Sequence, residues 1–248
     1  MLRWGSHALR VAPWQGQADI ASVVPLPGAG APPPSTVHRW REQLAQRGYK
    51  AVVTGAMARA DAVAFLEGGF RVRERLHLLG RDLGELPEPP DDAARAVVLR
   101  RPRRADRDGI LAADAASFGP DWRFDRVALA DAVAATPVSR VRVVDGDDGD
   151  DGDGDGDGGV IVGYAISGRA GPLGYLQRLA VRPEARRRGL GAALVLDGLR
   201  WMRRRGARRA LVNTQVGNDG ALALYHHLGF RPEPDDLVVL TADLAPRT

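Results

Sequence analysis

The sequence predicts an α/β (α+β) fold in which helices cover the faces of a mixed β-sheet. Two observations support this prediction. Short apolar runs of strand length alternate with longer runs whose apolar residues recur at helical spacing. The 248 residues, 44% of them hydrophobic, are also sufficient for one large packed domain or two small ones.

The first elements of the downstream region are predicted as one strand followed by two helices. Residues 94–102 form a short apolar run with Val97–Leu99 at its centre, which favours a strand. Apolar residues at helical spacing predict helices over residues 105–119 and 125–136.

A hairpin with an unusual loop follows. Residues 139–145 alternate Val with Arg, which predicts a half-buried strand, and residues 159–170 are its expected partner. The tract Asp145–Gly159 between them holds eight aspartates and no basic residue. Repeat calcium sites need an apolar residue in each turn to build a core, and this tract has none. We therefore expect a flexible hairpin loop.

The remaining elements alternate strand and helix. Strands are predicted over residues 173–183, 207–216 and 235–244, and helices over residues 189–206 and 218–230. The full order is therefore strand, helix, helix, three strands, helix, strand, helix, strand.

An internal repeat and a linker predict the domain organisation. Residues 47–71 parallel residues 205–231: both have Gly, an apolar strand, a short loop, a helix and then Gly-Phe-Arg. Residues 84–92, "GELPEPPDD", are typical of a linker. We predict domains over residues 1–92 and 93–248, the first being a partial copy of the second. Two roles for the first domain are left open: packing on the second domain, or forming a homodimer.

Composition limits the partners. The absence of cysteine excludes disulfides and thiolate metal sites and fits the reducing cytoplasm. No apolar run is long enough to span a membrane. Apart from Lys50 the basic residues are arginines, which favours anionic partners. The basic stretch Arg200–Arg209 lacks interleaved aromatic residues, so nucleic acid is not the favoured partner. No metal site is predicted, because His226 and His227 would point about 100° apart on a helix.

One short segment predicts an anion site. "EARRRGLGAAL", residues 184–194, places three arginines and two glycines between a strand and a helix. The first turn of a helix has unpaired N–H groups and a partial positive charge. Glycines let the backbone approach phosphate oxygens closely. The segment lacks the Lys-Ser/Thr of a Walker A turn and the third Gly of a dinucleotide turn.

The spacing of Arg186, Gly189 and Gly191 resembles the acyl-CoA pyrophosphate loop of the GNAT family of N-acetyltransferases. Asn218, Ala221, Leu224-Tyr225 and Gly229-Phe230 resemble a second signature of that family. The resemblance covers residues 95–244 in element order and is most specific over residues 173–231. It implies a splayed central sheet in the second domain, a partial GNAT-like first domain, and acetyl-CoA as co-substrate.

The resemblance also implies the roles of single residues. The pantetheine arm would bind to the backbone of one strand, near Asn218 and Ala221, and the pyrophosphate would bind to the amides of the turn and its arginines. The strand residues are Leu179, Ala180 and Val181; those of the turn are Arg186, Arg187, Arg188, Gly189, Leu190, Gly191 and Ala192.

Two residues are expected to take part in the chemistry itself. Tyr225 would lie near the thioester sulfur as the candidate acid, and we expect it to donate a hydrogen bond to the departing thiolate at least as much as a full proton. Gln177 stands where related enzymes often have a carboxylate and cannot act as a base. The base is therefore a water chain or Asp121, in the stretch 117–125 that should line the acceptor site. In the first copy of the repeat, Phe65 and Ala58 replace Tyr225 and Asn218.

Two functions follow. The first is transfer of acetyl from acetyl-CoA to an amine on a protein N-terminus or a small molecule, by direct attack in a ternary complex. The alternative is a non-catalytic acyl-CoA-binding module, favoured only by the missing strand carboxylate.

Overall fold

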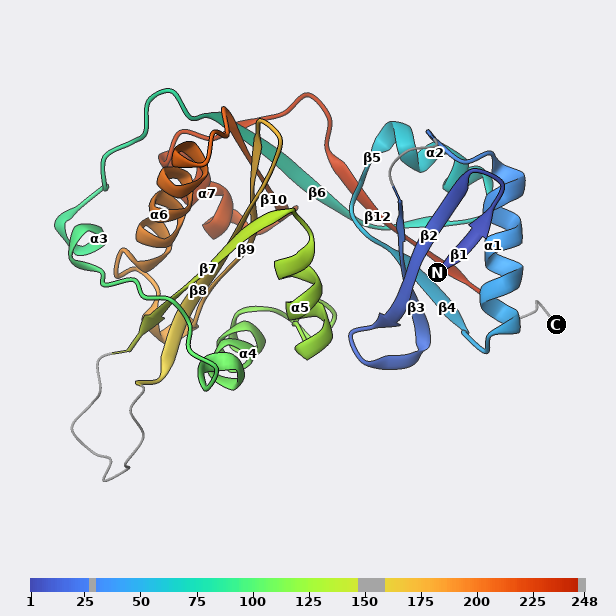
Figure 1. Cartoon of the computed structure of the whole chain (residues 1–248), viewed down its shortest axis with the longest axis horizontal. Coiled ribbons are helices and arrows are strands. Elements are labelled where there is room, and N and C mark those ends of the chain that lie inside the picture. Colours follow the sequence, from blue (N-terminus) through green and yellow to red (C-terminus); the bar gives the residue numbers. More distant parts are fainter. Residues whose placement is uncertain (27–29, 147–158, 245–248) are drawn as a thin grey trace. The chain divides into compact units, whose positions relative to one another are not determined.

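The computed structural model describes residues 1–26, 30–146 and 159–244 (Figure 1). The chain forms two compact units that interleave along the sequence. Unit 1 contains Met1–Leu78, Asn213–Asn218 and the segment from Pro232 onward, and unit 2 contains Leu79–Val212 and Asp219–Arg231.

Unit 1 is a mixed sheet with two helices. Its strands follow the order β1-β2-β3-β4-β12-β6, with β5 beside β12 and β3 parallel to β4. Val37, Trp40 and Phe65 of the helices belong to one buried cluster with strand residues. The strands are β1 Leu2–Trp4, β2 His7–Trp14, β3 Gln17–Pro25, β4 Ala51–Thr54, β5 Met57–Ala58, β6 Arg71–Asp82 and β12 Leu237–Asp243; the helices are α1 Pro34–Gln46 and α2 Arg59–Glu67.

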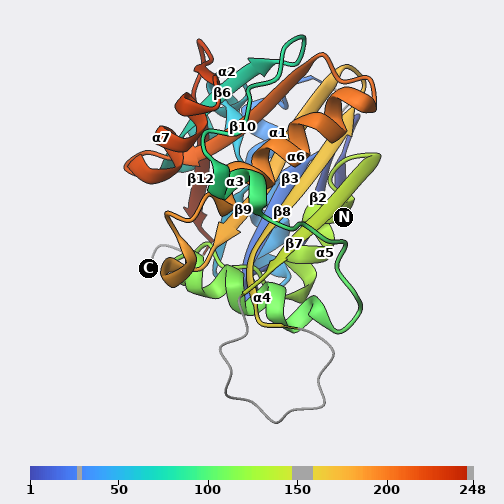
Figure 2. The same cartoon turned by 90° about the vertical axis from the view of Figure 1, so that its left-hand side faces the viewer.

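Unit 2 has helices on both faces of its sheet, whose strands follow the order β10-β9-β8-β7 (Figures 1 and 2). Its strands are β7 Val138–Asp145, β8 Ile161–Ala170, β9 Leu173–Val181, β10 Arg209–Gln215 and the two-residue β11 Arg231–Pro232. The last residues of β10 and β11 belong to unit 1. Its helices are α3 Asp92–Ala96, α4 Asp106–Ser117, α5 Arg126–Ala134, the 3-10 turn Pro183–Ala185, α6 Leu190–Arg204 and α7 Asp219–His227.

Successive side chains of β8 point to opposite faces of the sheet, so the core of unit 2 has one part on each face. Tyr164 and Ile166 pack with residues of α4 and α5, including Ile110. Ala165 packs with the cluster that contains the apolar face of α6. The helix α6 therefore covers one face and α4 with α5 the other, as Figure 1 shows.

The predicted hairpin is confirmed, since β7 and β8 are antiparallel partners from Val138–Arg169 to Asp145–Ile161. Both helices predicted between residues 105 and 136 are present. The Asp/Gly tract lies outside the described residues from 147 to 158, and its expected flexibility stays a prediction.

The strand predicted over residues 94–102 is wrong. The helix α3 occupies its beginning, where the Asp91 side chain accepts a hydrogen bond from the Ala94 N–H at 2.7 Å. Val98 is 80% exposed, and of these residues only Arg100 makes a β-bridge, with Val143. Residues 94–102 therefore do not form a strand, because Asp91 caps a helix at their start and Val98 has no strand partner among the described residues, which outweighs their β-propensity.

The closing strand joins an unexpected neighbour. β12, at the C-terminal end of the chain, pairs antiparallel with β4 and β6 inside unit 1. Residues 79–83 in turn belong to unit 2, where the Leu83 N–H donates to the Arg208 carbonyl at 2.9 Å. The domain boundary at residue 92 stays a prediction.

In the described part of the chain, no helix combines the length and apolar character that crossing a membrane requires.

Candidate functional site

The turn between β9 and α6 presents backbone N–H groups. Arg187 and Gly189 both have left-handed backbone conformations, with φ of 63° and 75°. Gly189 is the N-cap of α6, and its carbonyl accepts the first hydrogen bond of the helix, from the Ala193 N–H. The amides of Leu190, Gly191 and Ala192 therefore precede the helical hydrogen-bond ladder, as expected for the first turn of a helix. This arrangement provides the donors that an anion requires.

The arginines of the turn lie at the surface. Arg186, Arg187 and Arg188 are all exposed. The Arg186 Nε donates to the Val181 carbonyl at 3.1 Å, which ties the start of the turn to the end of β9. Positive side chains and oriented amides thus belong to one short segment of unit 2.

The two glycines of the turn allow close packing as well as backbone freedom. A Cβ atom on Gly189 would lie 2.6 Å from the Ala94 nitrogen, so α3 packs directly on the turn. A Cβ atom on Gly191 would lie 3.2 Å from the Leu224 Cδ2, so α7 packs on the start of α6. Because α7 contains Tyr225, the turn and this tyrosine are held by the same packing.

Tyr225 is 4% exposed and belongs to the same cluster as the buried face of α6. Its ring lies 5.7 Å from that of Phe230. Burial raises the pKa of Tyr225 well above its ordinary value. A neutral tyrosine hydroxyl can donate one hydrogen bond.

The strand β9 has a bulge near its middle. Ile166 pairs with Arg178 and Ser167 with Leu176, so Gln177 has no partner in the β8 register. The parallel register with β10 runs from Leu173–Arg209 to Leu176–Val212, whereas β9 continues to Val181. Such a bulge leaves backbone groups outside the regular ladder.

After the bulge, side chains of β9 alternate between the two faces of unit 2. Ala180 is buried in the cluster of α4 and α5, and Leu179 and Val181 pack on the cluster of α6. Because the predicted role of these three residues uses backbone groups, it stays a prediction.

Two predicted site residues lie at the surface. Asp121 is exposed in the loop between α4 and α5, and Asn218 is exposed immediately before α7. Asn218 belongs by its contacts to unit 1, and Ala221, on α7, is half-buried in unit 2. The roles predicted for all three stay predictions.

A buried ionic cluster next to the Asp121 loop was not predicted. The Asp114 carboxylate, with an exposed fraction of 0%, accepts hydrogen bonds from Tyr164 at 2.6 Å and from Arg178 at 2.7 and 2.9 Å. Burial, followed by the Asp114 charge, raises the pKa of Tyr164. One sequence signal marks this site: Asp114 stands on the stripe of Ile110, Ala113 and Ser117, which faces the sheet.

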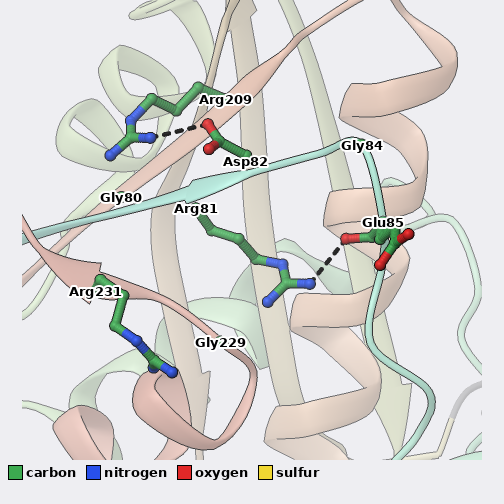
Figure 3. Close-up of a pocket in the computed structure, with 8 residues that line it drawn as sticks. All are labelled: Gly80, Arg81, Asp82, Gly84, Glu85, Arg209, Gly229 and Arg231. Carbon is green, nitrogen blue, oxygen red and sulfur yellow. Dashed lines mark hydrogen bonds and ion pairs between the residues drawn. The ribbon is translucent and has the colours of Figure 1, made fainter.

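Figure 3 shows a pocket of about 360 Å³ in unit 2. Arg81 lies at its centre and donates to the Leu228 carbonyl at 2.6 Å, so it caps the C-terminal end of α7. None of the lining residues is a predicted site residue. They are Gly80, Arg81, Asp82, Gly84, Glu85, Arg209, Gly229 and Arg231.

Comparisons with known proteins agree with the expected family. The acetyltransferase (GNAT) family profile matches residues 147–230. A mycothiol acetyltransferase of Salinispora arenicola is 30% identical over 233 residues, covering 87% of this chain and 74% of the relative. Another, from Saccharomonospora viridis, is 30% identical over 141 residues, and the match covers 53% of this chain but only 44% of that relative.

Two solved structures share the fold. A GCN5-related N-acetyltransferase from Sphaerobacter thermophilus aligns with a TM-score of 0.61 at 19% identity, over 98% of this chain and 78% of the other. A tandem GNAT protein from the clavulanic acid biosynthesis pathway aligns with a TM-score of 0.64 at 16% identity, over 98% and 80%.

Proposed function

Because the chain belongs to the GNAT family of acetyltransferases, we propose that it transfers an acetyl group from acetyl-CoA to an amine. The observation that carries this proposal is the turn over residues 186–192, where unpaired helix-start amides and three arginines come together. A diphosphate fits this chemistry, because it has several anionic oxygens for N–H donors and guanidinium groups.

The thioester would lie along β9 beyond the bulge. A backbone N–H there would donate to the thioester carbonyl and stabilise the negative charge that develops on its oxygen. The amine nitrogen then attacks the carbonyl carbon, and the C–S bond breaks as the new C–N bond becomes an amide. The products are the acetylated amine and free CoA thiol.

Tyr225 would assist the departure of the thiolate. The pKa of a tyrosine is ordinarily above that of a thiol, and burial raises the pKa of Tyr225 further, so full proton transfer from the tyrosine is unfavourable. We propose that it donates a hydrogen bond to the developing thiolate, which then takes up the proton released by the amine. That proton would first pass to a water chain or to Asp121, because Gln177 is not basic.

The acceptor is proposed to be a small molecule in preference to a protein N-terminus. The relatives at 30% identity are named mycothiol acetyltransferases, so small amines related to mycothiol are the first candidates. We also propose a cytoplasmic location, which the cysteine-free sequence supports.

The test is release of CoA thiol from acetyl-CoA in the presence of a panel of small amines and peptides. Wild type should release thiol only with an accepted amine, and Tyr225→Phe should lower kcat about 100-fold, since it removes one donor to developing charge. Calorimetry with acetyl-CoA should give the same Kd for both proteins. Binding without any thiol release would instead support the non-catalytic acyl-CoA-binding module.

A further inference from the structure

The buried pair Arg178–Asp114 joins two parts of unit 2 that are 64 residues apart in sequence. Arg178 belongs to β9 and Asp114 to α4. The guanidinium meets the carboxylate as a two-pronged fork, and the side chains are only 10% and 0% exposed. Such paired hydrogen bonds fix orientation as well as distance.

The same two side chains hold the loop between α4 and α5, residues 118–125, which we call the acceptor loop. Arg178 Cζ lies 3.4 Å from the centre of the Phe118 ring and 3.9 Å from that of Phe124. Its Nη2 donates to the Trp122 carbonyl at 2.6 Å. The Phe124 N–H donates to Asp114 at 2.6 Å. The beginning, the middle and the end of the loop are thus all fixed to this ion pair.

Stability alone does not account for this arrangement. Removing two charges from water is costly, and apolar replacements of buried ion pairs are often equally stable or more stable. An apolar side chain at position 178 would still fill the space between the two phenylalanine rings. It would lose the directional bonds to Asp114 and Trp122. The charged pair therefore contributes a defined loop geometry.

The position of Arg178 on β9 connects that geometry to the chemistry. Arg178 directly follows Gln177, the residue at the bulge. The bulged part of β9 is where the thioester is proposed to lie, and the acceptor loop contains Asp121. A shift of about 1 Å between reacting groups can lower a rate about 100-fold.

We propose that Arg178, held by Asp114, is a positioning residue that sets the acceptor loop at a fixed distance from the thioester strand. This inference rests on the proposed acetyl transfer. It assigns amine binding to the loop that Arg178 holds, and it gives Arg178 no contact with acetyl-CoA.

The experiment compares Arg178→Met and Asp114→Asn with wild type. For Arg178→Met we expect kcat to fall by up to about 100-fold and the KM for the accepted amine to rise about tenfold or more, with the KM for acetyl-CoA unchanged within about twofold. Arg178→Lys keeps the charge but not the fork, so it should recover part of the loss. The lysine variant also keeps the test available if the methionine variant does not fold.

The matched control is Arg100→Met. Arg100 is also partly buried and bonds to Asp106 at the other end of α4 and to Asp145, away from the acceptor loop. A general loss of stability should affect both variants, whereas only Arg178→Met should change the KM for the amine.

Hydrogen exchange gives a readout that does not depend on activity. In Arg178→Met the amides of residues 118, 119 and 121–124 should exchange at least about tenfold faster, while those of residues 186–192 should not change. If wild type acetylates no amine, the proposed function fails, and this exchange measurement alone decides whether Arg178 holds the loop. Unchanged exchange in residues 118–124, or an equal rise in amine KM in Arg100→Met, would overturn the inference.

Discussion

The two copies of the internal repeat share several contacts and differ in the residues at the predicted site. In residues 47–71 the Phe70 N–H donates to the Phe65 carbonyl at 3.0 Å, and in residues 205–231 the Phe230 N–H donates to the Tyr225 carbonyl at 2.9 Å. The ring pairs are also matched, at 5.3 and 5.7 Å. The repeat seen in the sequence is therefore a structural repeat as well.

Even the helix ends are capped in the same way. Arg41 donates to the Gly68 carbonyl at 2.8 Å in the first copy, and Arg81 donates to the Leu228 carbonyl at 2.6 Å in the second. Each carbonyl precedes a glycine with a positive φ, Gly69 or Gly229. These two arginine caps stabilise the helix ends and involve none of the predicted site residues.

The copies differ where the preceding helix begins. The helix α1 starts with Pro33 and Pro34, which have no N–H groups, whereas α6 starts with Gly189 and Leu190, which have them. The first copy also has Phe65 in place of Tyr225. The two copies therefore differ in the donors at one helix start, and we propose that these donors bind the anion in the second copy only.

The largest expected effect comes from separating the copies. A chain cut at residue 92 removes Leu79, Leu83 and Arg81 from unit 2 and leaves β12 without β4 and β6. We expect residues 93–248 expressed alone to lack a cooperative unfolding transition in urea. Residues 79–248 restore the core residues of unit 2 and serve as the control. Cooperative unfolding and acetyl-CoA binding by residues 93–248 would instead confirm the boundary at residue 92.

The next effect concerns the turn that only the second copy has. Gly189→Ala places a side chain at φ 75° and against the Ala94 backbone, so it should cost about 3 kcal/mol of unfolding free energy and weaken acetyl-CoA binding. Gly191→Ala meets only the flexible end of Leu224 and should cost less than about 1 kcal/mol. Urea unfolding and calorimetry measure both. Equal losses in the two variants would contradict this role of the turn.

A smaller effect is expected from making the first copy resemble the second. Phe65 is 1% exposed, so Phe65→Tyr buries a hydroxyl and should destabilise the protein by about 1–3 kcal/mol. It should add no second turnover site, because α1 begins with prolines. Thiol release and urea unfolding together check this prediction, and a gain in acetyl transfer would contradict it.

The smallest effect is a loss of stability at high pH. Burial raises the pKa of Tyr225, and burial together with the Asp114 charge raises that of Tyr164. A raised folded-state pKa contributes stability that is complete below the unfolded value near 10 and is lost as the pH rises through the folded value. The unfolding free energy should therefore fall above pH 10, by up to about 1.4 kcal/mol per pH unit for each tyrosine. Urea unfolding measured across this pH range should give a smaller fall of the unfolding free energy for Tyr225→Phe, because this variant lacks one of the two buried tyrosines.

Local patterns were sufficient for much of this molecule. The helices over residues 105–119 and 189–206 and the hairpin strands could be predicted, because apolar periodicity acts within a single element. The structure of residues 94–102 could not be predicted, because an apolar run such as Val97–Leu99 forms a strand only where a neighbouring strand can pair with it. Asp114 was missed because its partner Arg178 is 64 residues away.

The sequence by itself determined the glycine turn before α6 and the repeat, since the identity and spacing of Arg186, Gly189 and Gly191 act over a few residues. Only the tertiary structure decided that β12 completes unit 1, that burial raises the pKa of Tyr225, and that Arg178 reaches Asp114 and the acceptor loop. The physical reason is distance along the chain. Strand neighbours, desolvation and buried ion pairs depend on segments that meet only after folding, and no local pattern records which segments those are.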